Sequence, residues 1–390
     1  MKVERGSISS NDLMFAVFCF MQATVLRSGY IISVTRQDSW AMAITGFLFS
    51  LSFMAIYAML LQKFPGKNLF EIDNIVLGPI FGKIISALYL FFFVSLAALN
   101  TRDLGNFVID YMMPETPIAA VIVVFLIGCA YSIHKGIKNL MQLSTMICIV
   151  TVVAVIINTI LVLKDIEPGF LKPLFQLEPI KYVKATVSVG AVPMGEILAF
   201  MMLTPMLGKD TKAAKPFLFG LILSTISMVI VILRDIVILG PLVSIVSLPS
   251  FESVRYISVS GVLTRMESIY AVILIFLFLF KTSILLYAFA LGLTQILSQK
   301  SSLPVDIDTE NQACETGRLL RQKSYPPLLL VSTALVLFYS LFVFESVMEN
   351  MDWGATTAPF FSLTFELLLP AITLLTAYIQ KRGSPREVKA

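Results

Sequence analysis

The chain has 390 residues, of which 57% are hydrophobic and 14% are charged, with a mean hydropathy of +0.87. Soluble proteins carry about 25% charged residues, so this composition excludes a soluble domain of this length and indicates a polytopic membrane protein. The net charge of +4 comes from basic residues in loops between apolar runs, which gives no reason to expect nucleic-acid binding.

Ten apolar segments follow one another along the chain, each near the ~20 residues that a bilayer requires. They are predicted at approximately 12–35, 40–62, 84–112, 117–134, 142–163, 184–206, 216–247, 267–298, 326–346 and 358–380. The loops between them are short, so we expect a single membrane domain over residues 1–390, with a polar cytoplasmic loop at 299–325. We expect the apolar segments to be surrounded by the lipid bilayer.

Lysine and arginine in the short loops predict the orientation. With the N-terminus inside, the cytoplasmic segments hold about eighteen of these residues and the outer loops about seven. Both termini are therefore predicted to face the cytoplasm.

Two connecting segments have patterns of their own. Residues 66–79 predict a short interfacial helix that ends at Gly78-Pro79, because glycine and proline together stop a helix. The outer segment 249–266 predicts a partly ordered cap.

Ten spans divide into two fives of opposite orientation, because an odd number of spans inverts the second half. The first repeat is predicted at about 12–163 and the second at about 184–380, which makes helix six the counterpart of helix one. This inverted symmetry is inferred from topology and not from similarity between the two halves.

Helix six contains the most unusual stretch, from Val187 to Met206. Gly190, Pro193 and Gly195 interrupt it, and Glu196 puts a carboxyl near its middle. Irregular backbone at membrane depth survives only where protein or a water-filled cavity satisfies it, so this stretch predicts a binding site. The alternative is a proline kink with Glu196 paired to a neighbouring helix.

Helix one has a polar interruption at a similar depth, Thr24-Val-Leu-Arg-Ser-Gly29. Paired interruptions in corresponding helices indicate a midplane site of the transporter type. Arg27, Glu196 and Lys281 of helix eight would then share one cavity, with Glu196 and Lys281 neutralising each other and Arg27 receiving an anionic group. Alternatively, Arg27 extends towards the membrane surface or pairs with Glu196 and touches no ligand.

Other ionisable residues lie within the spans. Arg102-Asp103 and Arg234-Asp235 are adjacent pairs, and neighbours on a helix do not face each other, so we expect each to find partners on other helices. We interpret these four residues, and Glu366 of helix ten, as structural or gating charges rather than ligand contacts.

Helix three presents Phe92 and Leu96 at helical spacing, a pattern that is usually core packing but that would line a pocket beside a broken helix. The four cysteines have no metal-ligand spacing, and His134 is the single histidine. No nucleophile and base can be paired, so we expect neither enzyme activity, nor a metal, nor a cofactor.

Several motifs together resemble the spore-germination protein B-subunit family, the membrane component of nutrient germinant receptors, over about residues 5–382. The motifs are Gln37-Asp38-Ser39-Trp40, Thr101-Arg102-Asp103, Pro114-Glu115-Thr116-Pro117, Gly195-Glu196 with Pro205, Arg265-Met266-Glu267-Ser268, and Lys281 with Tyr287-Ala288. The resemblance implies the fold of the amino acid/polyamine/organocation transporter superfamily: ten helices in a five-plus-five inverted repeat with helices one and six broken.

The resemblance also implies a role and partners. The implied role is nutrient sensing in the spore inner membrane of an endospore-forming bacterium. The implied partners are a partly soluble A subunit and a lipoprotein C subunit of the same complex. By position it implies nutrient contacts from Arg27, Ser28, Gly29, Phe92, Leu96, Pro193, Glu196 and Lys281. The sequence leaves open two other readings: a proton-coupled transporter of amino acids or amines, and an assembly scaffold for the other subunits.

Overall fold

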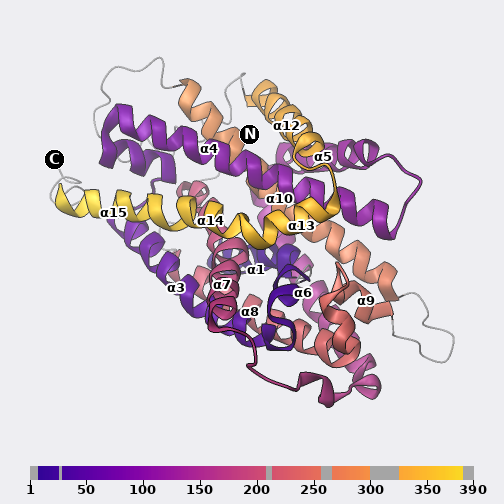
Figure 1. Ribbon diagram of the computed structural model, residues 1–390. Coiled ribbons are helices and arrows are strands. Elements are labelled where there is room, and N and C mark those ends of the chain that lie inside the picture. The colour runs from indigo at the N-terminus through magenta and orange to yellow at the C-terminus, as the bar shows by residue number, and fades with distance from the viewer. Residues whose placement is uncertain (1–7, 26–28, 208–212, 256–265, 299–324, 381–390) are drawn as a thin grey trace.

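The computed structural model describes residues 8–25, 29–207, 213–255, 266–298 and 325–380 (Figure 1). Across these ranges the regular elements are helices, and the one extended contact is an isolated bridge between Ile8 and Leu207. The predicted all-α class is confirmed. Arg27, Ser28 and the predicted loop 299–325 up to residue 324 lie outside the described residues, and Tyr325 begins a helix.

The first half of the chain contributes six helices: α1 Ser10–Val25, α2 Gly29–Thr35, α3 Ser39–Lys63, α4 Leu69–Tyr111, α5 Ile118–His134 and α6 Ile137–Leu161. A short 3₁₀ turn, Arg36–Asp38, joins α2 to α3.

The second half begins with α7 Pro179–Val189, which continues as a π turn Gly190–Met194 and a 3₁₀ segment Gly195–Met202. The remaining helices are α8 Ala214–Leu239, α9 Pro249–Arg255, α10 Met266–Ser298, α12 Tyr325–Phe342, α13 Val347–Thr356, α14 Ala358–Leu363 and α15 Leu369–Ile379, with a π turn Thr364–Leu368 between the last two.

Seven helices in the described part are long and apolar enough to cross a membrane, or eight if the bent pair Pro327–Phe342 and Val347–Thr356 is one span. Ile118–His134 is a shorter apolar helix, and α1 has 16 residues, below the length that a bilayer requires of one straight helix. The multi-span membrane fold is thus confirmed. The count of ten helices stays a prediction.

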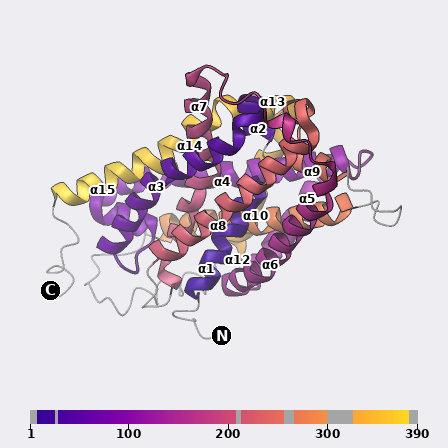
Figure 2. The ribbon, with the colours of Figure 1, turned by 90° about the horizontal axis from the view of Figure 1, so that it is seen from below.

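Helix α1 lies at the centre of the bundle, packed against α6, α8 and α10, while α4 packs against α10 and α12 (Figure 2). The bridge between Ile8 and Leu207 places the beginning of helix one beside the end of helix six. Further along, the ring of Phe20 contacts that of Phe200, so residue numbers rise along helix one as they fall along helix six and the two helices are antiparallel. The division into repeats at 12–163 and 184–380 stays a prediction.

The predicted helix before Pro79 is present as the first part of α4. It begins with a capping box between Asn68 and Glu71 and is interrupted at Gly78, whose φ of 81° suits glycine. One face of this part is buried against α15, whose Thr373 hydroxyl donates to the buried Asp73 carboxylate at 2.8 Å. This segment therefore carries a buried acid that the sequence analysis did not single out.

The predicted outer cap is partly present as α9, and residues 256–265 lie outside the described ranges. In contrast to this buried helix, α5 and α6 expose apolar side chains such as Val124, Ile127 and Met146. An apolar outer face is the expected surface of a helix in contact with lipid.

Candidate functional site

Helix six departs from α geometry at the predicted residues. A π turn shifts the backbone hydrogen bonds by one residue, which accommodates Pro193 and its missing N–H. The following segment, Gly195–Met202, is 3₁₀ and buried throughout. The chain keeps right-handed helical dihedrals at Val189, Met194 and Gly195, so the interruption is a change of helix type rather than an extended loop.

Helix one is described on both sides of its predicted interruption, as α1 up to Val25 and α2 from Gly29. Gly29 packs closely against the backbone carbonyl of Ser247, where a β-carbon would overlap it. Arg27 and Ser28, both expected ligand contacts, fall among the residues that the structure does not describe.

Lys281 joins helices one, six and eight. Its ammonium lies 2.5 Å from the Glu196 carboxylate and donates to the Thr24 hydroxyl at 2.6 Å. It also lies 5.0 Å from the centroid of the Phe20 ring, within range of a cation–π interaction. Glu196 and Lys281 therefore neutralise each other, and both are buried.

A cavity of about 90 Å³ lies next to this ion pair. One water needs about 10–15 Å³ by a comparable measure, so the cavity has room for several waters or a small organic molecule. Its walls are Thr24, Asp103, Val192, Ser247, Asn350, Met351 and Gly354. Thr24 is common to the cavity and the ion pair, and Val192 belongs to the π turn of helix six.

Helix α13 forms one wall of the cavity. It turns by 101° from the preceding α12, and its Asn350 amide donates to the Asp103 carboxylate at 2.6 Å. Arg102 donates to the Leu341 carbonyl of α12 at 3.2 Å. A β-carbon at Gly354 would meet no atom within 4 Å, so this position leaves the cavity open. The adjacent pair Arg102-Asp103 thus meets two other helices, and its gating role stays a prediction.

Glu366 packs against helix six at Gly195. It lies in the π turn Thr364–Leu368 with its side chain fully buried, and a β-carbon at Gly195 would overlap its carboxylate. The Tyr57 hydroxyl donates to the Glu366 carbonyl at 2.6 Å and lies 3.3 Å from the Gly195 carbonyl. Tyr57 of α3 therefore links the irregular parts of helices six and ten.

The expectation for Arg234 and Asp235 was partly wrong. The Arg234 guanidinium donates to the neighbouring Asp235 carboxylate at 2.7 and 3.0 Å, since a long side chain can fold back along its own helix. Asp235 also accepts from Ser250 at 2.5 Å and Ser253 at 2.7 Å, both on α9. The aspartate thereby anchors α9 to α8.

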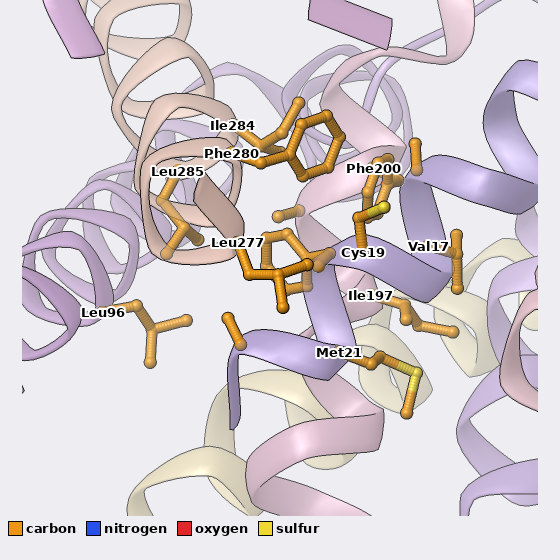
Figure 3. Close-up of a cluster of buried hydrophobic side chains, with 14 of the residues drawn as sticks. Val17, Cys19, Met21, Leu96, Ile197, Phe200, Leu277, Phe280, Ile284 and Leu285 are labelled. Atoms are coloured by element: carbon orange, nitrogen blue, oxygen red, sulfur yellow. The ribbon is translucent and has the colours of Figure 1, made fainter. Parts of the chain in front are cut away.

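Phe92 and Leu96 both lie in apolar surroundings. The Phe92 ring stacks on Phe365 with a centroid distance of 4.8 Å. Leu96 belongs to a buried cluster with Met21, Ile197 and Leu277 (Figure 3). Neither side chain lines the cavity. Pro193 does not line it either, although the preceding residue Val192 does.

Three residues at this site were missed as contacts by the sequence reasoning. Thr24 was noted only as part of an interruption, and Asn350 and Tyr57 are ordinary polar and aromatic residues at helical positions. One signal was available: Pro370 follows Glu366 by four residues, and its missing N–H predicts that the Glu366 carbonyl needs another donor.

The fold and the site together define an integral membrane protein with a transporter-like helical bundle. A solved structure of the nucleobase-cation-symport-1 family transporter Mhp1, closed with bromovinylhydantoin bound, matches with a TM-score of 0.70 at 14% identity, covering 99% of this chain and 82% of that one. The inward-facing conformation of Mhp1 gives a TM-score of 0.58 at 15% identity, with 98% and 79% covered.

Residues 7–305 match the spore germination protein family, and the chain belongs to that family. Spore germination protein KB of Bacillus subtilis (strain 168) is 23% identical over 388 residues, covering 98% of this chain and 97% of that protein. Spore germination protein YndE of the same strain is 25% identical over 305 residues, with 72% and 81% covered.

Proposed function

We propose that this protein is the membrane subunit of a spore nutrient germinant receptor and that it binds a small polar nutrient in the cavity beside the irregular parts of helices one and six. The main support for this proposal is that Thr24 both lines the cavity and accepts a hydrogen bond from Lys281, the ion-pair partner of Glu196. A ligand that donates to the same lone pair of the Thr24 oxygen therefore competes with the buried ion pair.

This competition gives binding a route to a conformational change. A ligand shifts an equilibrium between two arrangements only by its different affinity for each. In the present arrangement Lys281 holds helix one through Thr24 and helix six through Glu196. A ligand that captures Thr24 loosens the link between these helices, and the partner subunits would respond to their movement.

The other predicted contacts on helices one, three, six and eight remain part of the proposal. Glu196 and Lys281 act through their ion pair, Pro193 shapes the π turn of helix six, and Gly29 begins α2. Arg27 and Ser28 lie in the predicted interruption of helix one, outside the described residues. Phe92 and Leu96 form apolar support on α4, because both side chains are buried among apolar neighbours.

The partners and the location follow from the family. We propose a complex with an A subunit and a lipoprotein C subunit in the spore inner membrane, with both termini cytoplasmic. In that orientation the cavity walls from α13 and Ser247 belong to outer segments, so the cavity faces away from the cytoplasm.

Substitution of Glu196 tests the proposal. In spores that carry this receptor as their only one, Glu196→Ala is expected to abolish germination triggered by amino acids, sugars or nucleosides supplied one class at a time. Protein level is checked by immunoblot, because removal of Glu196 leaves Lys281 buried without its partner. The double variant Glu196→Gln/Lys281→Met removes both charges and restores a neutral interior while the response stays absent.

Glu115→Gln is the matched control, since Glu115 is exposed between α4 and α5. It is expected to germinate at the wild-type rate. A normal nutrient response in Glu196→Ala spores with a normal amount of protein would remove Glu196 from the site.

A second candidate function is proton-coupled transport of amino acids or amines, favoured by the likeness to a solved transporter over nearly the whole chain. Uptake of labelled amino acid into vesicles that hold this chain alone would support transport. A response that requires the partner subunits supports the receptor. Nutrient binding by the isolated chain argues against a third role as an assembly scaffold.

A further inference from the structure

Glu366 is a fully buried carboxyl group for which neither oxygen has a hydrogen-bond partner among the residues that the structure describes. Buried carboxylates in proteins are normally paired with a cation or satisfied by several donors. The proposed nutrient cavity does not use Glu366, since its walls come from other residues. The group therefore needs an explanation of its own.

The local backbone puts this carboxyl at a junction between two helices. Glu366 lies in a π turn, a geometry that is rare and is often found at functional sites. Pro370 cannot donate to the Glu366 carbonyl, and the Tyr57 hydroxyl donates to it instead at 2.6 Å. The carboxylate itself packs against Gly195, in the segment where helix six changes its helix type.

The charged and titratable groups around Glu366 do not balance its charge. Glu196 and Lys281 lie within electrostatic range from helix six and α10. The Lys281 ammonium has three donors, and its contacts with Glu196, Thr24 and the Phe20 ring occupy that capacity. Two carboxyl groups thus share one ammonium, which lies against Glu196.

Three further groups face the same interior, Tyr57 from α3 and Tyr89 and Asp73 from α4. Tyr89 lies within electrostatic range of Glu366, Tyr57 and Asp73. The Tyr89 hydroxyl and one Asp73 oxygen, like the Glu366 carboxyl, have no partner in the described part of the chain. Three buried polar groups that each have an atom without a hydrogen-bond partner therefore lie in one region between α4, helix six and helix ten. Within the described ranges, an ionised Glu366 would have acidic and phenolic neighbours there and no cation of its own.

We propose that Glu366 is a proton-binding site at the junction of helices six and ten, which holds its proton in the arrangement seen here and releases it to water when the Thr364–Leu368 turn moves away from Gly195. The neutral acid removes the charge imbalance around Lys281. Release of the proton requires access to water, which this packed arrangement does not offer because the side chain is fully buried.

The proton is then a ligand with different affinity for two arrangements, so its concentration biases their balance. Low pH stabilises the packed junction. Rising pH favours the arrangement in which Glu366 is ionised and hydrated. The cavity walls do not include Glu366, but both sites border the Glu196–Lys281 ion pair, so proton binding and nutrient binding are expected to influence each other.

Infrared difference spectroscopy on the full chain in lipid nanodiscs tests the proposal directly. A buried protonated carboxyl has a carbonyl-stretching band that disappears on ionisation. The wild-type protein is expected to show such a band in mildly acidic buffer and to lose it in alkaline buffer. Glu366→Gln is expected to lack this component, whereas Glu196→Gln, Asp73→Asn and the exposed control Glu115→Gln retain it.

Thermal unfolding gives a second readout that a merely structural role would not move. The melting temperature of the wild type is expected to fall by a few degrees from mildly acidic to alkaline buffer, and that of Glu366→Gln to fall by less than half as much. A full band in Glu366→Gln, or a wild-type Glu366 that is ionised in acidic buffer, overturns the proposal. So does a band that is present only when sodium and potassium are replaced by a large organic cation, because the site would then hold a metal cation.

Discussion

Two carboxyl groups in this protein are buried to the same extent and have opposite surroundings. Asp235 on α8 accepts hydrogen bonds from Arg234, Ser250 and Ser253, whereas Glu366 has no partner for its carboxyl among the described residues. Asp235 is surrounded by groups that stabilise its negative charge, whereas Glu366 shares the Lys281 ammonium with Glu196, against which that ammonium lies. Burial alone therefore does not separate a structural charge from a functional one. The hydrogen-bond and ion-pair partners of each carboxyl group distinguish the two cases.

The largest loss of stability is expected at Asp235, whose carboxyl group has several hydrogen-bond partners. Asp235→Asn removes the charge that Arg234 faces and should destabilise the protein by about 3–5 kcal/mol, because it leaves a buried cation without compensation. Unfolding by heat or denaturant in detergent measures this loss. Glu252→Ala on α9 is the control: its ion pair with Arg255 is partly exposed and should contribute less than about 1 kcal/mol. Equal losses for the two variants would contradict the role of Asp235 as an anchor of α9.

A medium effect is expected where Glu366 meets helix six. Gly195→Ala forces the Glu366 carboxyl away from the backbone and should cost about 1–3 kcal/mol, as other overpacked sites do. Gly128→Ala is the matched control, since its β-carbon would make only an ordinary contact of 3.5 Å with Leu279. If both variants are equally stable, the close approach of helices six and ten is not maintained in solution.

A smaller effect is expected from the hydroxyl that links the two irregular segments. Tyr57→Phe removes the donor to the Glu366 carbonyl and should cost about 1–2 kcal/mol, because a buried acceptor loses its partner. Tyr131→Phe alters an exposed ring on α5 and serves as the reference. A neutral result for Tyr57→Phe would show that water satisfies the carbonyl equally well.

The smallest effect is expected at Glu366 itself. Glu366→Gln replaces a neutral acid by an amide of similar shape, so stability near neutral pH should change by less than about 1 kcal/mol. Together with Asp235→Asn, this variant tests the comparison directly. A loss at Glu366→Gln as large as that at Asp235→Asn would mean that Glu366 is ionised and stabilised by its surroundings.

The sequence predicts the parts of this site that carry a strong local signal. Gly190, Pro193 and Gly195 predict irregular backbone in helix six because each alters helical geometry through its own covalent structure. Glu196 and Lys281 stand out because charge is costly inside a membrane, and they do form an ion pair. The resemblance to the spore-germination family also agrees with the family match.

Other features depend on which helices meet, and that information is not local. The sequence does not reveal that Tyr57 reaches Glu366 across more than 300 positions, or that Asn350 meets Asp103. The rule that neighbours on a helix do not face each other failed at Arg234, because a long flexible side chain can bend towards Asp235. The number of spans was the least predictable feature, since π and 3₁₀ segments and a 101° bend divide continuous apolar runs into several elements.

The open position at Gly354 has a consequence for how the cavity could change its size. A methyl or hydroxymethyl group added there would project into empty space and meet none of the surrounding atoms. A single codon change could therefore shrink the guest molecule's compartment without any repair elsewhere in the bundle. If the cavity binds a nutrient as we propose, duplicated copies of the gene would then differ in the size of the compound they recognise while sharing one scaffold.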